Sequence, residues 1–195
     1  MRDDGEAGAP ALFGISGSLR AASSNTKLIH EAARAFGPSR FEVGDVRLPL
    51  YDGDLEERAG IPPEVARLAE RVGNADAVVI ATPEYNKNVS GVLKNAIDWL
   101  SRVKPGPLAG KPVAIVSSAA GRAGGERAQF SLRHCLVPLH PRILTGPEVT
   151  IAGAGKAFGE DGRLVDPMSF EFLERLMAAL RDEVALLERA GAKAG

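Results

Sequence analysis

The sequence predicts one α/β domain with a doubly wound, five-stranded parallel sheet, strand order 2-1-3-4-5, between two layers of helices. Apolar runs of strand length alternate with amphipathic segments of helix length along the chain. Residues 75–82 and 112–118 are apolar almost throughout, as expected for central parallel strands covered on both faces. The 195 residues contain no recognisable linker and are a usual length for a single domain.

Strands are expected at the apolar runs. The segment 41–48 alternates less regularly than the others and is therefore placed at the outside of the sheet. The predicted strands cover 11–16, 41–48, 75–82 and 112–118, and a last one begins at 142–144.

Helices are expected where apolar residues recur at three- and four-residue spacing. Pro62 suits the first turn of one of them. The apolar face of the closing helix is expected to cover the sheet rather than to bind a partner. The predicted helices cover 25–36, 62–72, 90–100, 126–137 and 169–190.

Residues 1–10 are predicted to form a disordered tail, and residues 11–190 the domain. The tail is acidic, unlike a signal peptide, and no apolar run approaches the roughly 20 residues that span a bilayer, so we expect a cytoplasmic protein with no membrane association. The formal net charge of -1 lacks the basic excess of nucleic-acid-binding proteins. Cys135 is the single cysteine, so redox chemistry in this chain would need a bound cofactor.

The loop after the first strand, residues 17–26, indicates an anion site. It offers hydroxyls, an amide and backbone N–H groups at the start of a helix, where the helix dipole favours negative charge. Arg20 adds a fixed positive charge that suits phosphate. The loop matches neither GxGxxG nor GxxxxGK[ST]. The alternative is that Ser23, Ser24 and Asn25 cap the helix and bind nothing.

Two further loops follow the third and fourth predicted strands. Residues 82–90 bring Pro83, Tyr85 and amide side chains, which suit the edge and wall of a flat heterocycle, although a simple surface turn is the alternative. Residues 117–125 are small and rich in glycine, so their backbone can approach a ring closely. Because the carboxyl ends of parallel strands share one sheet edge, the three loops predict one site for a phosphate and a ring, which matches flavin mononucleotide (FMN).

These loops also carry a resemblance to a known family. The stretches GSLRAASSN (17–25), LPLYDGDLE (48–56), TPEYNKNVSGVLKNAIDWLSR (82–102) and PLAGKPVAIVSSAAGRAGGERAQFSLR (107–133) resemble the NADPH-dependent FMN reductases, which include soluble quinone, azo-dye and chromate reductases. The resemblance covers residues 11–150 and implies a flavodoxin-like fold with bound FMN.

The resemblance also implies which residues bind FMN. The phosphate loop implies Ser18, Arg20, Ser23 and Asn25, joined by Ser16 and Thr26. The loops that border the isoalloxazine ring imply a second set: Pro83, Glu84, Tyr85, Asn86, Ser117, Ser118 and Gly121.

The implied activity is electron transfer from NADPH or NADH, through FMN, to a quinone, flavin or other small-molecule electron acceptor by a ping-pong mechanism. No catalytic side chain is expected, because the cofactor carries the chemistry. Arg102, Lys87 and Arg122 are candidates for the phosphates of the nicotinamide cofactor. The alternatives are a flavodoxin-like electron carrier that serves a protein partner, which the near-neutral net charge disfavours, and a flavoprotein without turnover.

The resemblance further implies a homodimer or homotetramer with FMN near a subunit interface. Arg102 and Glu148 match positions of an inter-subunit polar network, whose tyrosine is replaced here by Phe130. Trp99 is expected either at that interface or in the core, and Lys94 and Asp98 are expected to pair on one helix. No metal site is expected, since a structural role suits His134, Cys135 and His140 better than metal binding.

Overall fold

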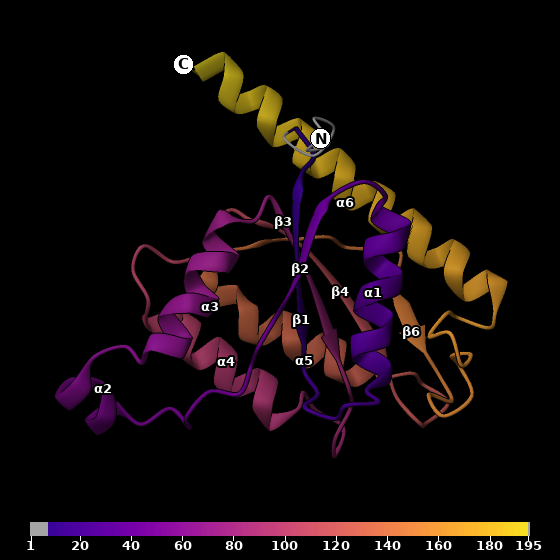
Figure 1. Ribbon diagram of the computed structural model, residues 1–195, viewed down its shortest axis with the longest axis horizontal. Coiled ribbons are helices and arrows are strands. Elements are labelled where there is room, and N and C mark those ends of the chain that lie inside the picture. Colours follow the sequence, from indigo (N-terminus) through magenta and orange to yellow (C-terminus); the bar gives the residue numbers. More distant parts are fainter. Residues whose placement is uncertain (1–7, 195) are drawn as a thin grey trace, which may run out of the picture.

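The computed structural model describes residues 8–194, and its sheet has the predicted order. The parallel strands lie in the order β2-β1-β3-β4-β5, with β6 also paired to β4. Figure 1 shows α1 and α6 on one face of the sheet and α3, α4 and α5 on the other. The strands are β1 (Ala11–Ser16), β2 (Arg40–Gly44), β3 (Ala77–Thr82), β4 (Pro112–Ser118), β5 (Arg142–Ile143) and β6 (Val149–Ile151).

The predicted helices are all present, with ends that differ by a few residues. Ser90 caps α4 rather than beginning it, because its Oγ accepts a hydrogen bond from Leu93 N. Pro167 begins α6 two residues before the predicted start. The helices are α1 (Ser24–Phe36), α2 (Gly53–Ala59), α3 (Pro63–Asn74), α4 (Gly91–Arg102), α5 (Glu126–Leu136), η1 (Val137–Leu139) and α6 (Pro167–Ala194).

The alternation of side chains along the strands builds two cores. Val78 and Ile80 of β3 face the layer of α3, α4 and α5. Val79 of the same strand faces α1 and α6, where Leu176 and Met177 are buried. The prediction that the closing helix covers the sheet is therefore confirmed.

The fifth position of the sheet differs from the prediction, because it is split into two strands. Val113 of β4 pairs with Ile143, whereas Val116 pairs with Val149, so residues 144–148 form an insertion between β5 and β6. Pro147 lies in this insertion and has no N–H for the ladder. The second half of the strand places Thr150 and Ile151 beside the carboxyl end of β4, at the edge of the sheet where the site is predicted.

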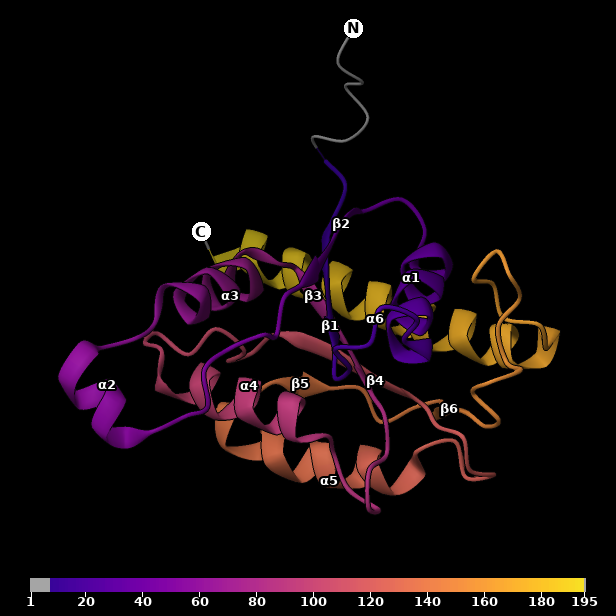
Figure 2. The same ribbon diagram turned by 60° about the horizontal axis from the view of Figure 1, so that its bottom comes forward.

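The sequence did not predict α2, which projects from the body as part of an arm (Figure 2). None of its residues is buried, so it has no apolar periodicity to detect. The arm is fastened at its base: Asn95 Oδ1 accepts from Tyr51 N at 2.8 Å, and Asn95 Nδ2 donates to Pro49 O at 2.9 Å. Trp99 is fully buried and donates from Nε1 to the same carbonyl, so it belongs to the core of the chain.

The ends of the domain stay partly a prediction. Residues 1–7 of the expected tail lie outside the described residues, while Pro10 O accepts a hydrogen bond from Arg40 N.

Lys94 and Asp98 form the expected ion pair, with Nζ 2.6 Å from Oδ1. Within residues 8–194, no helix is both long and apolar enough to span a bilayer.

Candidate functional site

Three loops meet at the carboxyl ends of β1, β3 and β4, as predicted. They surround a pocket of about 510 Å³, which we name the strand-end pocket. Most of the predicted ligands line it, together with residues that were not predicted: Ser18, Arg20, Ala22, Ser23, Ser24, Asn25, Pro83, Glu84, Tyr85, Ser118, Ala119, Ala120, Ala154 and Gly155.

The first loop presents the N-terminus of α1 to this pocket. Ser23 Oγ caps the helix by accepting from Thr26 N at 3.2 Å, and the first turn of α1 contains no acidic residue. Ser90 Oγ donates to Gly17 O at 2.6 Å and fixes the start of the loop against α4. Arg20 is exposed at the rim of the pocket. The loop therefore combines a helix dipole with a guanidinium, which suits a phosphate group.

Three of the predicted phosphate-loop residues make side-chain hydrogen bonds between different strands and helices of the fold. Thr26 Oγ1 donates to Ser16 Oγ at 2.9 Å, and neither residue lines the strand-end pocket. Asn25 does line the pocket, but its amide bonds to both backbone groups of Ser118. Direct FMN binding by these three residues stays a prediction, and the geometry shows that they also connect β1, α1 and β4.

The second loop forms a short hairpin that walls the pocket. Tyr85 and Asn88 exchange two backbone hydrogen bonds of 3.0 Å, and both residues between them have positive φ, as a type I′ turn requires. One of these is Asn86, which is exposed at the tip and lies outside the pocket lining. Pro83 and the half-exposed Tyr85 face the pocket from the base of the hairpin.

Glu84 points toward the first turn of α5. Its Oε2 accepts from Ala128 N at 3.4 Å, and its Oε1 lies 3.7 Å from Arg127 Nη1. It lines both the strand-end pocket and an adjoining pocket of about 630 Å³, which we name the glycine-loop pocket and which residues 119–127 line together with Glu84. Gly121 lies in this adjoining pocket.

The third loop is held tightly at its base. Ser117 Oγ donates to Gly124 O at 2.7 Å and accepts from Gln129 Nε2 at 2.9 Å. Gly125 has a φ of 99°, and a Cβ there would lie 2.7 Å from the Cβ of Ser117, so no other residue fits without movement. Ser117 is thus a buried structural group behind the pocket wall.

Ser118 differs from its neighbour. Its Oγ is buried and has no hydrogen-bond partner among the described residues, although the residue lines the strand-end pocket. Buried hydroxyl groups without a partner are unfavourable, so this group is free to bond a polar ligand or a water.

Sequence reasoning missed the loop after β6. Ala154 and Gly155 complete the pocket, and Ala154 N donates to Ala119 O at 3.1 Å. The small side chains of Ala154 and Gly155 carry no chemistry that predicts a ligand site. The sequence showed only that the segment 153–162 is rich in glycine.

Glu31 of α1 holds the far part of this loop. The residue is 3 % exposed, accepts from Leu164 N at 3.1 Å and pairs with Arg34 at 2.8 Å. Burial raises the pKa of Glu31, but the hydrogen bonds from Arg34 and Leu164 and the charges of Arg34 and Arg163 outweigh burial and leave the pKa lowered.

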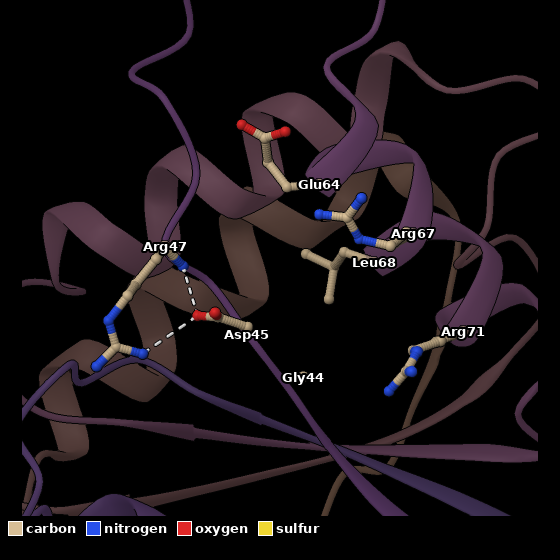
Figure 3. Close-up of a pocket in the computed structure, with 7 residues that line it drawn as sticks. All are labelled: Gly44, Asp45, Arg47, Glu64, Arg67, Leu68 and Arg71. Atoms are coloured by element: carbon tan, nitrogen blue, oxygen red, sulfur yellow. Dashed lines mark hydrogen bonds and ion pairs between the residues drawn. The ribbon is translucent and has the colours of Figure 1, made fainter.

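Another pocket, of about 230 Å³, lies between the end of β2 and α3 (Figure 3). We name it the arginine pocket, after Arg47, Arg67 and Arg71 in its lining. Arg47 Nη1 bonds Asp45 Oδ1 at 3.3 Å, and Arg71 Nη1 bonds Glu42 Oε2 at 3.0 Å. Because two of its arginines are paired with carboxylates, this pocket suits an anion less well than the strand-end pocket does.

The residues of the strand-end pocket fit FMN. The pocket has the volume of a small-molecule site, with cationic and N–H donors at one end and an aromatic wall at the other. A phosphate suits the α1 end, and the buried Ser118 hydroxyl offers a hydrogen bond to a polar ligand.

Comparisons with known proteins agree with this fit. The family model of the NADPH-dependent FMN reductases matches residues 10–156. An NAD(P)H-dependent FMN reductase of Pseudomonas aeruginosa is 45 % identical over 172 residues, which cover 87 % of this chain and 92 % of that protein. A quinone reductase of Escherichia coli is 41 % identical over 169 residues, covering 84 % and 89 %.

A solved structure leads to the same family. The flavoenzyme FerB of Paracoccus denitrificans, an NAD(P)H:(acceptor) oxidoreductase, superposes with a TM-score of 0.81 at 32 % identity, over 90 % of this chain and 97 % of that one. The fold, the pocket and these relatives agree, and the chain belongs to the NADPH-dependent FMN reductase family, whose flavodoxin-like enzymes use FMN and an NAD(P)H donor.

Proposed function

We propose that this chain reduces quinones or similar small acceptors with electrons from NAD(P)H, through FMN held in the strand-end pocket. The observation that carries the proposal is the meeting of the α1 N-terminus, the Pro83–Tyr85 wall and the unpartnered Ser118 hydroxyl around one pocket. Bound FMN would supply the redox chemistry by taking a hydride from NAD(P)H and passing electrons to the acceptor.

The side chains and backbone of the chain bind and orient the cofactor. Arg20 and the N–H groups at the start of α1 hold the phosphate, while Pro83, Tyr85, Ala119 and Ala120 flank the ring. Ser118 Oγ supplies a hydrogen bond to the flavin. Tyr85 is half exposed, so one side of the site is open to solvent.

The donor and the acceptor use that open side in turn, which makes the reaction ping-pong. The adjoining glycine-loop pocket takes part of the nicotinamide nucleotide, with Arg122 and Arg127 near its phosphates. Arg102 suits the phosphates of the nicotinamide cofactor less well, because its Nε donates to Glu56 Oε2 at 2.8 Å. Lys87 lies exposed at the tip of the hairpin.

Stopped-flow absorbance near 450 nm tests the proposal. FMN-loaded protein is mixed anaerobically with NADPH or NADH, and a quinone is added afterwards. We expect bleaching by at least one nucleotide and recovery on addition of the quinone. A bound flavin that neither nucleotide bleaches would instead support an electron carrier reduced by a protein partner.

The homodimer or homotetramer and the cytoplasmic location stay predictions. Phe130, at the position of the interface tyrosine, is 56 % exposed on α5, and Glu148 is exposed in the insertion after β5. Light scattering of the purified protein, with and without a Phe130→Asp substitution, tests whether this face joins two copies.

A further inference from the structure

Asn25 joins two distant parts of the chain through a pair of hydrogen bonds. Its Nδ2 donates to Ser118 O at 2.9 Å, and its Oδ1 accepts from Ser118 N at 3.0 Å. The two residues are 93 positions apart, and Asn25 is only 2 % exposed. One side-chain amide therefore satisfies both backbone groups of a residue in the wall of the strand-end pocket.

This contact joins two strand ends that are not neighbours in the sheet. Asn25 lies in the first turn of α1, directly after the phosphate loop, and Ser118 ends β4, where the third loop begins. Strand β3 separates β1 from β4, so no strand pairing joins these two ends directly. The Asn25 amide crosses above β3 and makes that connection.

The end of β4 is also fixed from the opposite side. Gln129 Nε2 donates to Ser117 Oγ at 2.9 Å and to Val149 O at 2.8 Å, which fastens β4 to β6 and α5. The end of β4 is thus bonded on both sides, and Asn25 attaches the phosphate loop to it at Ser118.

We propose that Asn25 is a positioning residue that sets the distance between the phosphate end and the ring end of the FMN site. It acts by holding α1 to β4, and it is not a ligand of FMN. This inference rests on the proposed placement of FMN. A rigid separation matters because both ends of one ligand bind together only if the two parts of the site match its length.

The amide retains one N–H and one lone pair, so direct contact with the phosphate or the ring is the competing role. The two roles differ in what happens to fragments of the cofactor. Loss of a direct ligand weakens the fragment that the ligand touches. Loss of a positioning residue leaves each fragment able to bind and weakens only the molecule that joins them.

The experiment uses the full chain without flavin and the variant Asn25→Leu, which keeps the size of the side chain and removes both hydrogen bonds. Dissociation constants are measured for FMN, for riboflavin and for inorganic phosphate, the last by competition with FMN. We expect FMN affinity to fall about tenfold or more, while riboflavin and phosphate change less than about twofold.

Asn95→Leu is the matched control, because Asn95 makes the same two kinds of bond to a distant backbone at Pro49 and Tyr51, in the arm. We expect it to leave all three affinities unchanged. Asn25→Ala also removes both hydrogen bonds to Ser118 and adds neither charge nor bulk beside the phosphate end, so it should give the same pattern of affinities as Asn25→Leu. This variant decides the question if Asn25→Leu does not fold.

The outcomes separate the two claims. A fall in phosphate or riboflavin affinity that parallels the fall for FMN would show a direct ligand and overturn the inference, as would an unchanged FMN affinity. An unaltered wild-type chain that binds no FMN would contradict the proposed function itself.

Discussion

The strand-end pocket and the arginine pocket differ in how far carboxylates compensate their positive charges. The arginine pocket contains Arg47, Arg67 and Arg71, and Arg47 pairs with Asp45 (Figure 3). Arg71 pairs with Glu42, which lies outside the pocket lining. The strand-end pocket contains Arg20, a helix N-terminus whose first turn has no acidic residue, and one carboxylate, Glu84, which lies 3.7 Å from Arg127. We therefore expect uncompensated donors, rather than the number of arginines, to mark the anion site.

The largest expected effect separates the two pockets directly. Arg20→Ala should weaken FMN binding about 10- to 100-fold, because a hydrogen bond to a charged group contributes about 1.5–3 kcal/mol. Arg67→Ala, in the arginine pocket, should leave FMN affinity unchanged. Titration of flavin fluorescence measures both, and an equal loss in the two variants would remove the distinction.

A smaller effect is expected on the free energy of unfolding, when a buried and an exposed carboxylate that each pair with an arginine are compared. Glu31→Gln should lower the free energy of unfolding by about 1–2 kcal/mol at pH 7, because Arg34 and Leu164 N lose a charged acceptor. Asp45→Asn, in an exposed pair, should change it by less than about 0.5 kcal/mol.

The effect of Glu31 should depend on pH. Its pKa is lowered in the folded state, so its contribution is present above the ordinary value of 4.5 and is lost as pH falls through the folded-state pKa. Urea unfolding of Glu31→Gln and wild type between pH 7 and pH 3.5 should show the two stabilities converging at the acid end. A constant difference over this range would contradict the assignment.

The neighbouring serines at the end of β4 should respond in opposite ways. Ser118→Ala removes a hydroxyl that has no partner among the described residues, so the flavin-free protein should keep its stability while FMN affinity falls about three- to tenfold. Ser117→Ala should lower the free energy of unfolding by about 1–2 kcal/mol, because Gln129 Nε2 and Gly124 O each lose a partner. Thermal unfolding with and without FMN distinguishes these results.

The smallest expected effect lies where the two regions connect. Arg47 Nη2, from the arginine pocket, donates to Leu19 O in the phosphate loop at 3.2 Å. Arg47→Ala should weaken FMN binding by less than about threefold, since this contact is exposed. Arg71→Ala is the matched control and should have no effect on FMN affinity, so a loss there would assign the arginine pocket a part in flavin binding.

Much of the fold was predictable because the central strands bury both faces. The apolar runs of β3 and β4 and the one-sided helices allow few other arrangements. Helix α2 was not predicted, because it buries no residue and so has no apolar periodicity. Strand β6 was not predicted, because its three residues are too few to show the alternation of a strand. The last strand begins at Arg142, as predicted, and the sequence did not predict the insertion that Pro147 occupies.

The site was predictable where its residues carry distinctive chemistry. Arg20, the serines of the first loop and Tyr85 are recognisable in the sequence and do line one pocket. Ala154 and Gly155 are not, since their contribution is shape alone. The partners of Asn25 were equally hidden, because an amide in a phosphate loop looks the same whether it binds a ligand or a distant backbone.

The split fifth position has a consequence for solubility. A long uninterrupted strand at the edge of a sheet offers a row of unpaired backbone groups on which another chain can add a strand. Here one edge is divided by residues 144–148, and the other edge, β2, is five residues long with exposed Arg40 and Glu42. Both edges are thus poor templates for aggregation, and deletion of the insertion to join β5 and β6 should make the chain more prone to associate edge to edge.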